Sequence, residues 1–389
     1  MAGQAHKGRP HLFAAGIAAG LTLAILFAGR AIAIQCERSS VRALAPEVFP
    51  LKNQGLAFQR AAAQARDVLP LYGSSEVGYP RDVRGGDFFR SAPTGFQVSP
   101  AGKAGASPLI LLQKIGALDR DLRDKKVAVS ISSSWFWGDP NPYLYEGNFS
   151  RFAASHLIFD SRLDLALKHD IAARLVEYPG TLESTPLLDF AVRRLASGSR
   201  LDYLVLRAVW PLGKLQDTIW DLQDHFAALA MLRTQAQPVP QQRQTLDWPS
   251  LIATAERAAA SDPRKRPDLL RHRDELNRDA WFHEHLSSSK AWTDVELLLR
   301  VLQQIRARPL LLSMPMNGPY CNGLNISRAA RQEFYDRLER LAQRYDFELV
   351  DFQEHDEDPN FLNPHLTAKG WIFFNRVIDD FMHDRLPKT

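Results

Sequence analysis

The chain has 389 residues, of which 45% are hydrophobic and 24% charged, so it is long enough for one large globular domain or two moderate ones. Its net charge is +4, and basic residues alternate with acidic ones, so no basic stripe predicts a nucleic-acid partner. The two cysteines, Cys36 and Cys321, form no CxxC pair, and the histidines lack metal-ligand spacing. We therefore expect neither a metal nor another cofactor.

The N-terminus predicts a membrane anchor. Lys7 and Arg9 precede an apolar run at 12–29, which is near the lower length limit for a helix that spans a bilayer of ~30 Å. Positive charge before the run favours an N-in, C-out orientation. A cleaved signal peptide is the alternative, because "AIA" at 31–33 resembles a cleavage site, but the run is longer than a usual signal core. We expect residues 1–35 to be an uncleaved single-pass anchor in the cytoplasmic membrane.

The body that follows predicts an α/β fold with a doubly wound sheet, because strand-like and helix-like segments alternate. Near-continuous apolar runs at 125–137 and 308–320 are typical of parallel strands covered on both faces. Further strands are expected at 69–71, 95–100 and 347–352. Helices are expected at 328–346, at 365–386, and after Ser107, which would cap a helix that has Pro108 in its first position.

Residues 150–300 interrupt this alternation, because they are rich in helical pattern and in tryptophan. We interpret them as a helical insertion into the α/β core and not as a separate domain. Residues 36–66 are expected to form a juxtamembrane linker and a helix. One extracytoplasmic domain, 67–389, would then carry both the sheet and the insertion.

Four loops follow predicted strands, at 73–76, 102–105, 132–135 and 315–320, and ligands of open parallel sheets bind outside the carboxyl ends of the strands. The first loop is Gly-Ser-Ser-Glu, the second is rich in glycine, and His365 precedes the last helix. A serine hydroxyl becomes a nucleophile when a neutral histidine takes its proton. Backbone N–H groups of a Gly-rich loop approach an oxyanion closely. These parts are the minimum for acyl transfer.

The anchor followed by "YGSSE", "GKAGAS", "VSISSSWF", "MPMNGPY" and "HLTAKGW" resembles the DltD-type D-alanine transfer proteins, which are membrane-anchored members of the SGNH/GDSL hydrolase superfamily. The resemblance covers most of residues 68–385. It implies a three-layer α/β/α domain with a mostly parallel, SGNH-like sheet. It also implies that Ser75, and not Ser74, is the nucleophile, that the N–H groups of Ser75 and Gly105 form the oxyanion hole, and that His365 is the base.

The sequence departs from the family where an acid should orient the histidine. The family places an Asp three residues before this His, and Leu362 occupies that position in "DEDPNFLNPHLTAKGW". A triad acid fixes the tautomer of the His, so its loss affects the rate. If the chain is one residue shorter here than in its relatives, Asn363 occupies the place of the acid. In a second arrangement, Asp358 or Asp356 folds back to His365. In a third, the site is a Ser–His dyad without an acid. We favour Asp358 and Asn363 equally, and loss of activity is the remaining alternative.

Three more residues are candidates for contact with substrate, each with a plainer structural role. Glu76 fits a turn or helix start that bonds locally. Trp135 fits a pocket wall or the core. Asn317 has the position to orient a substrate, but Asn-Gly is also a common turn.

The resemblance implies an extracytoplasmic acyltransferase or esterase that carries an acyl group on Ser75 during D-alanylation of a cell-envelope polymer. It implies a membrane-bound O-acyltransferase and an acyl carrier protein as partners. A hydrolase of O-acetylated envelope polysaccharide is the first alternative. A catalytically weakened, membrane-tethered binding or scaffold module is the second.

Overall fold

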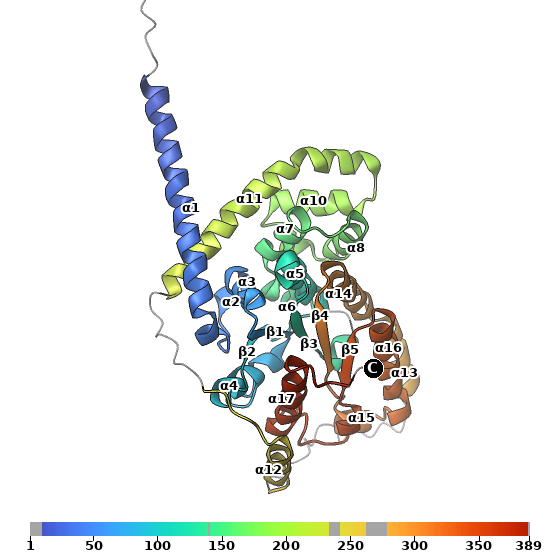
Figure 1. The fold of residues 1–389 in the computed structure, drawn as a ribbon. Helices are drawn as coiled ribbons and strands as arrows, with labels where there is room; N and C mark the ends of the chain where they lie inside the picture. Colours follow the sequence, from blue (N-terminus) through green and yellow to red (C-terminus); the bar gives the residue numbers. More distant parts are fainter. Residues whose placement is uncertain (1–9, 139–140, 233–241, 262–277, 388–389) are drawn as a thin grey trace, which may run out of the picture.

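A five-stranded parallel sheet lies at the centre of the body (Figure 1). The computed structural model describes residues 10–138, 141–232, 242–261 and 278–387. The strands are β1 Val68–Gly73, β2 Gln97–Gly102, β3 Lys126–Ile131, β4 Arg308–Ser313 and β5 Glu348–Asp351. Their order is β2-β1-β3-β4-β5, and every pair is parallel. The predicted α/β fold is confirmed, and the strand order reverses between β1 and β3, where ligands of such sheets bind.

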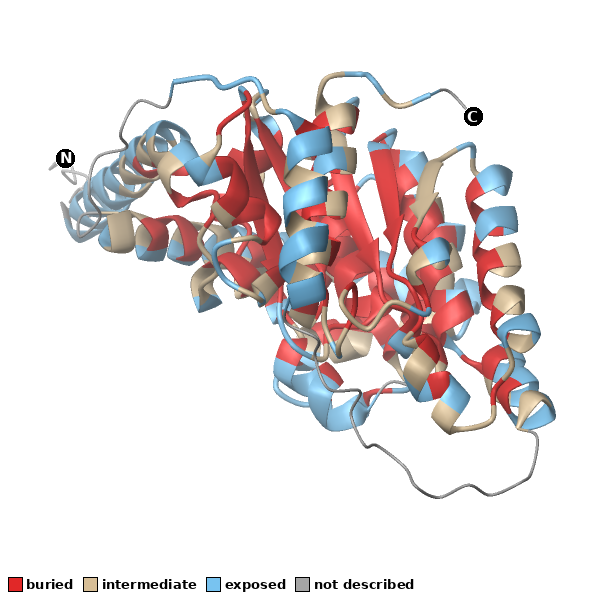
Figure 2. Cartoon of the chain, turned by 90° about the horizontal axis from the view of Figure 1, so that it is seen from below, coloured by how far each residue is buried: buried red, intermediate tan, exposed pale blue. Residues whose placement is uncertain are grey.

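Helices cover both faces of the sheet. Alternate side chains of β3 enter different cores: Val127 and Val129 lie in one, and Ala128 lies in the other. The first core is covered by α5 Pro108–Leu118, α14 Ala291–Ile305 and α16 Arg328–Arg344, and the second by α4 Gly85–Ser91, α12 Trp248–Ser261 and α17 Ala368–Met382. Figure 2 shows the buried sheet between helices whose outer faces are exposed. Burial on both faces explains why the central strands β1, β3 and β4 are mostly apolar, whereas the edge strand β5 is half-buried and carries Glu348 and Asp351.

The segment between β3 and β4 is helical. It contains α14 and α12, already described, and α6 Pro142–Asn148, α7 Arg151–Phe159, α8 Leu165–Leu175, α9 Pro179–Leu182, α10 Pro186–Ala196, α11 Arg200–Leu232 and α13 Asp279–Ser288. A buried ion pair joins α8 to α14, with Arg174 Nε 2.7 Å from Asp294 Oδ1. Leu157 of α7 and Leu167 of α8 belong to the same apolar core as Val127. The helices of this segment therefore extend the core of the sheet.

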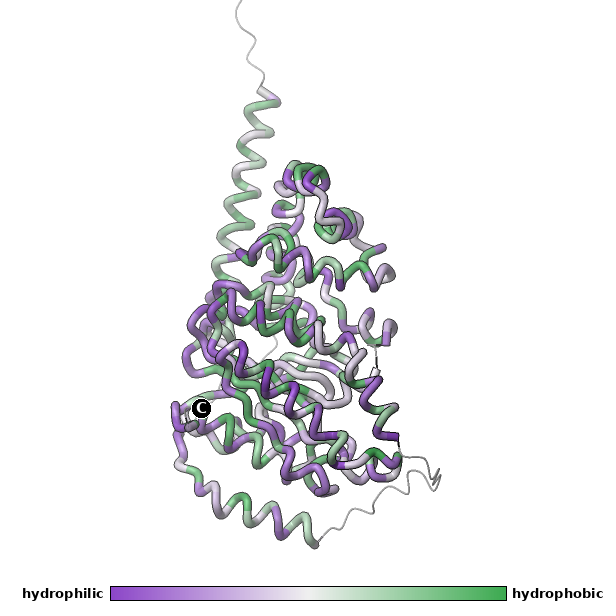
Figure 3. Tube along the Cα trace, turned by 90° about the vertical axis from the view of Figure 1, so that its right-hand side faces the viewer, coloured by the Kyte–Doolittle hydropathy of each residue, from purple (hydrophilic) through white to green (hydrophobic). Residues whose placement is uncertain are grey.

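The N-terminal helix α1, Pro10–Leu44, runs without interruption from the apolar segment into the body. By length and composition the helix could cross a membrane, and its most apolar part is not buried by the other described residues. Farther along, Ala33, Glu37, Val41 and Leu44 are buried against the body. Figure 3 shows the hydrophobic part of this helix projecting beyond the body. Two short helices, α2 Pro50–Gln54 and α3 Ala57–Gln64, lead from α1 to β1.

Candidate active site

The chain turns sharply at the end of β1 and leaves Ser75 half-buried at the start of a 3-10 turn, η1 Ser75–Gly78. The Ser74 N–H donates to Glu76 Oε1 over 2.8 Å, and the side chain of Glu76 is only 2% exposed. Burial raises the pKa of Glu76, while its hydrogen bonds with Ser74 and Ser130 oppose the rise. A Cβ on Gly73 would lie 2.4 Å from Glu76 Oε1, so glycine is required there. Glu76 is therefore the residue that holds the turn around Ser75.

The end of β2 lies directly beside this turn. Gly102 pairs with Gly73 in the parallel register. A Cβ on Gly102 would lie 2.3 Å from the carbonyl oxygen of Gly73 and 2.7 Å from Val77 Cγ2. The absence of a side chain at 102 thus lets the Gly-rich loop start in contact with the turn that holds Ser75.

We expect Gly102→Ala to push the two strand ends apart and to misplace Ser75. Overpacking of this kind costs about 1–3 kcal/mol, so the free energy of unfolding should fall by that amount. Labelling of Ser75 by a reactive-serine probe should fall with it. Gly78→Ala is the matched control, since no atom of the described residues lies within 4 Å of a Cβ added there, outside its chain neighbours. Unchanged labelling in Gly102→Ala would contradict this account of the turn.

Gly105 lies in the loop that follows β2, with a φ of +80° that favours glycine. The Ala106 N–H donates to the Lys103 carbonyl over 2.9 Å and closes the loop. Helix α6 supports it along its length: a Cβ on Gly105 would lie 2.9 Å from Leu144 Cβ, and Asn148 Nδ2, at the end of α6, donates to the Ala104 carbonyl over 3.0 Å. Ser107 follows as the first residue before α5, with Pro108 at the first helical position as predicted. Ser107 is thus the N-cap residue, as predicted, but its buried hydroxyl makes no hydrogen bond with any residue that the structure describes.

His365 lies in a tight loop that the chain bonds to itself. The Asn363 N–H donates to the His365 carbonyl over 2.8 Å, and Leu362 and Leu366 form an antiparallel bridge around them. Thr367 closes the loop by a hydrogen bond from its hydroxyl to the Asn360 carbonyl and caps α17. The backbone on either side of His365 is thus held in place.

Two aromatic residues join this loop to the end of η1. The indole of Trp371, in the first turns of α17, donates to the Tyr79 carbonyl over 2.9 Å. The Tyr79 ring lies edge-on to the His365 ring, with 6.3 Å between their centroids. Since η1 begins at Ser75 and Tyr79 is its C-cap, the fold brings the predicted base to the same turn as the predicted nucleophile. Sequence reasoning missed Tyr79; its only signal was an aromatic residue just after the nucleophile turn.

The candidate acids have other partners. Asp358 accepts from Lys369 at 2.9 Å and from the Asn360 N–H at 2.8 Å. Asp356 is buried and accepts from the Met316 N–H at 2.8 Å and from the Tyr335 hydroxyl. Burial raises the pKa of Asp356 to about 6.

Asn363 is half-buried, and its contact with His365 is the backbone hydrogen bond between them. No hydrogen bond reaches the imidazole of His365 from any of the residues that the structure describes. The roles of Asp358 and Asn363 therefore stay predictions, as does the pairing of His365 with Ser75.

Trp135 and Asn317 lie beyond the carboxyl ends of β3 and β4. Trp135 belongs to a second 3-10 turn, η3 Ser133–Phe136, and contacts the first core with part of its surface exposed. Asn317 caps the short helix α15 Gly318–Gly323 by accepting from the Tyr320 N–H at 3.1 Å. Both residues lie at the edge of the sheet where Ser75 lies, but the Asn317 carboxamide oxygen is used in the cap.

Comparison with known proteins decides the family. The sequence profile described as "DltD protein" matches residues 45–383, far more than half of the chain. This chain belongs to the DltD family. "Protein DltD" of Bacillus subtilis is 22% identical over 92% of this chain and 94% of its own length. "Protein DltD" of Staphylococcus aureus is 20% identical over 85% of this chain and 84% of its own.

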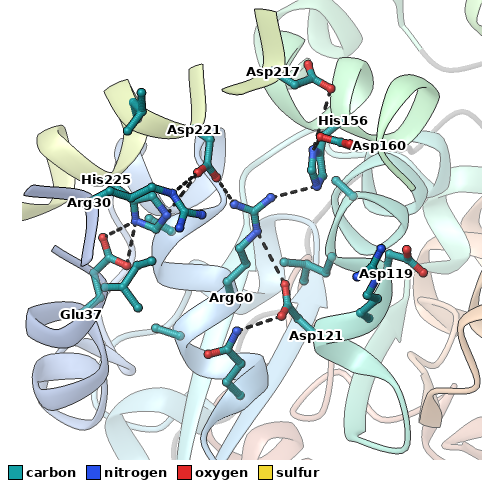
Figure 4. Close-up of a pocket in the computed structure, with 18 of the residues that line it drawn as sticks. Arg30, Glu37, Arg60, Asp119, Asp121, His156, Asp160, Asp217, Asp221 and His225 are labelled. Carbon is teal, nitrogen blue, oxygen red and sulfur yellow. Dashed lines mark hydrogen bonds and ion pairs between the residues drawn. The ribbon is translucent and has the colours of Figure 1, made fainter. Parts of the chain in front are cut away.

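A second polar site of this DltD family member lies between α1, α3, α7 and α11, in a cavity of about 470 Å³ (Figure 4). Arg60 is at its centre: the guanidinium pairs with Asp221, lies 3.6 Å from Asp121, and donates to His156 Nε2 over 2.9 Å. His156, Asp160 and Asp217 come close enough together to resemble a metal site.

The bond from Arg60 argues against a metal at this cluster. Because Arg only donates, His156 Nε2 accepts, and the proton of the neutral ring is on Nδ1. His156 Nδ1 lies 3.3 Å from Asp160 Oδ2 and 3.8 Å from Asp217 Oδ2, so it points this proton at the carboxylates instead of a lone pair at an ion. The cluster therefore belongs to a network of hydrogen bonds and ion pairs around Arg60 that joins α3, α7 and α11.

Asp217 should make the stability of the protein depend on pH. Its side chain is 1% exposed, and burial raises its pKa to about 7 from an ordinary 3.8. The folded state then binds the proton more tightly than the unfolded state, so this stabilisation is complete below about pH 4 and is lost as the pH rises to about 7. We expect the free energy of unfolding to fall by a few kcal/mol, at most roughly 4, over this range.

Asp217→Asn should remove that fall, because the amide does not ionise. Denaturant unfolding at pH 4, 5.5 and 7 measures it. Asp189→Asn is the control, since Asp189 pairs with Arg193 near the surface of α10. A wild-type pH profile in Asp217→Asn would show that another group is responsible.

Proposed function

We propose that this protein is a membrane-anchored serine acyltransferase that carries D-alanine as an ester on Ser75 during acylation of a cell-envelope polymer. The observation that carries the proposal is the junction of η1 with the His365 loop through Tyr79 and Trp371. Membership of the DltD family supports D-alanine as the acyl group.

The first half-reaction would acylate the enzyme. Ser75 Oγ attacks the carbonyl carbon of the acyl donor while His365 takes the hydroxyl proton. The N–H groups of Ser75 and Gly105 stabilise the oxyanion that forms. The bond to the leaving sulfur or oxygen then breaks, the leaving group receives the proton from His365, and D-alanyl remains on Ser75.

The second half-reaction would transfer the acyl group. A hydroxyl of the polymer gives its proton to His365 and attacks the ester carbon, and the bond to Ser75 Oγ breaks as the serine regains a proton. Two partners fit this sequence: a membrane-bound O-acyltransferase that brings the acyl group across the membrane, and an acyl carrier protein that loads it. Asp358 or Asn363 would turn toward His365 in the acylated state, where an imidazolium needs a partner.

The continuity of α1 supports an uncleaved anchor. Cleavage after Ala33 would cut the helix between Arg30, which lies 2.7 Å from Asp221, and Glu37, which bonds the buried His225 at 2.8 Å. Both contacts attach α1 to α11. With Lys7 and Arg9 on the inner side, in a segment outside the described residues, the body would lie on the outer face of the cytoplasmic membrane.

The test is to trap the acyl-enzyme. Purified full-length protein in detergent is offered D-alanyl and acetyl thioesters, and intact mass with peptide mapping locates the adduct. The proposal expects D-alanyl on the peptide that contains Ser75, and none in Ser75→Ala. A strong preference for acetyl would instead indicate the O-acetyl esterase, and no adduct with either donor would indicate a binding module.

A further inference from the structure

The long helix α11 exposes an apolar stripe to the surroundings of the body. Large aliphatic side chains recur every three or four residues, so they share one face of the helix. They are Leu201, Leu204, Val205, Leu212, Leu215 and Ile219, which we call the α11 stripe. Leu201 is 74% exposed, Leu212 57% and Leu215 58%. A continuous exposed face of this size marks an interaction surface.

The α11 stripe continues into the contact between α11 and α1. Phe226 lies on the same face of α11 as Leu212 and Leu215. Its ring packs against Gly29 of α1 so closely that a Cβ added to Gly29 would lie 2.8 Å from it. Leu222, on the flank of that face, shares the polar cavity with Phe27 of α1. The α11 stripe therefore faces the side on which α1 lies.

The two helices cross near Gly29 and diverge from there. Figures 1 and 3 show that the α10–α11 end of the body extends toward the same end of the molecule as the projecting part of α1. That part of α1 is also apolar and exposed, with Leu23, Ile25 and Phe27 more than half accessible. The space between the helices is thus a wedge whose two sides are apolar.

Ion pairs at the crossing hold the wedge open at a fixed angle (Figure 4). Asp221 of α11 accepts from both Arg30 of α1 and Arg60 of α3. His225 of α11, buried, bonds Glu37 of α1. These ion pairs lie at the narrow end of the wedge, where the anchor leaves its apolar segment.

The charges beside the α11 stripe suit phospholipid. Arg207 and Lys214 are exposed, and their spacing of seven residues places them on one flank of the stripe. Lys214 also pairs with Asp160 at 3.4 Å. A helix with an apolar face and a basic flank lies in the membrane interface, with its apolar face about 5–10 Å into the boundary of headgroups and acyl chains. Basic side chains near the surface are attracted to anionic lipid.

We propose that the α11 stripe is a second membrane contact, and that bilayer lipid fills the wedge between α11 and α1. The body is then docked on the outer leaflet at a fixed orientation and does not swing on a single helix. This inference rests on the proposed membrane span of α1, and it is independent of the acyl transfer at Ser75.

The test places an environment-sensitive fluorophore, NBD, on single cysteines of the full-length protein in vesicles of phosphatidylcholine and phosphatidylglycerol. Cys36→Ser and Cys321→Ala provide the background. The test sites are Leu212→Cys and Leu215→Cys. Leu21→Cys, in the exposed apolar part of α1, is the lipid control, and Gln343→Cys, exposed on α16, is the water control.

We expect NBD at 212 and 215 to behave like NBD at 21. Its emission should shift to the blue, nitroxides on the acyl chains should quench it, and iodide should quench it several-fold less than NBD at 343. Equal iodide quenching at 212, 215 and 343, with 21 still in lipid, would overturn the inference and leave the anchor intact. If iodide also quenched NBD at 21 as strongly as NBD at 343, both the second membrane contact and the membrane span of α1 would be overturned.

A protein partner on the α11 stripe would give a different pattern. Protection at 212 and 215 would then appear only in vesicles made from native membranes that contain other membrane proteins, and not in pure lipid. That result would overturn lipid as the occupant. Because both side chains are exposed, the cysteine variants should fold like the parent, which circular dichroism before labelling checks.

Discussion

Ser75→Ala is expected to reduce the D-alanine ester content of the cell envelope to that of a deletion strain. Without Oγ no acyl-enzyme forms, and loss of a nucleophile of this kind lowers turnover by at least ~10³-fold. The measurement is alkali-released D-alanine from cells that carry the variant as their only copy. Immunoblotting of membranes shows that the variant is present in normal amounts.

Ser74→Ala is the matched control for this experiment. Ser74 is buried, and its backbone N–H, which alanine keeps, makes the hydrogen bond to Glu76. We expect Ser74→Ala to retain most of the ester content. If Ser74→Ala lost the D-alanine esters and Ser75→Ala retained them, Ser74 would be the nucleophile instead of Ser75. If both variants retained the esters, the reaction would not pass through an acyl-enzyme on either serine.

His365→Ala is expected to have the second largest effect, because no base would then take the Ser75 proton. General base catalysis contributes about 10²–10⁴-fold, so acylation of the purified protein by a D-alanyl thioester should slow by that factor. Rapid quenching followed by intact mass gives the rate. Tyr79→Phe is the structural control, since it keeps the ring beside His365.

Two further variants address the partner of His365. Asp358→Asn and Asn363→Ala each test one candidate, and the one that orients His365 should slow acylation at least ~10-fold. Since Asp358 bonds Lys369, Lys369→Met shows whether an effect of Asp358→Asn arises through that pair instead. Near-normal rates in all three would support a Ser–His dyad, and a normal rate in His365→Ala would contradict the assignment of the base.

The sequence by itself was sufficient for the features that depend on local pattern. The strands β3 and β4 lie where continuous apolar runs predicted them, because a strand buried on both faces is apolar at nearly every position. The helix α16 lies where helical periodicity predicted it, because a helix buried on one face carries apolar residues every three or four positions. The uninterrupted α1 agrees with an apolar run and no helix breaker. The motif "YGSSE" located the candidate nucleophile at the end of a strand, as the structure has it.

Only the tertiary structure decided which distant segments meet. Nothing local to Tyr79 or Trp371 indicates that they join the nucleophile turn to the His365 loop. Likewise, nothing local to Asp358, which stays a candidate acid, indicates that it pairs with Lys369. The stripe on α11 likewise looks like an ordinary amphipathic face in sequence. Its exposure, and the contact of α11 with α1 through Arg30 and Asp221, are visible only in the folded chain. A sequence pattern records which side chains need burial or a partner, whereas the packing of the whole chain selects the partner.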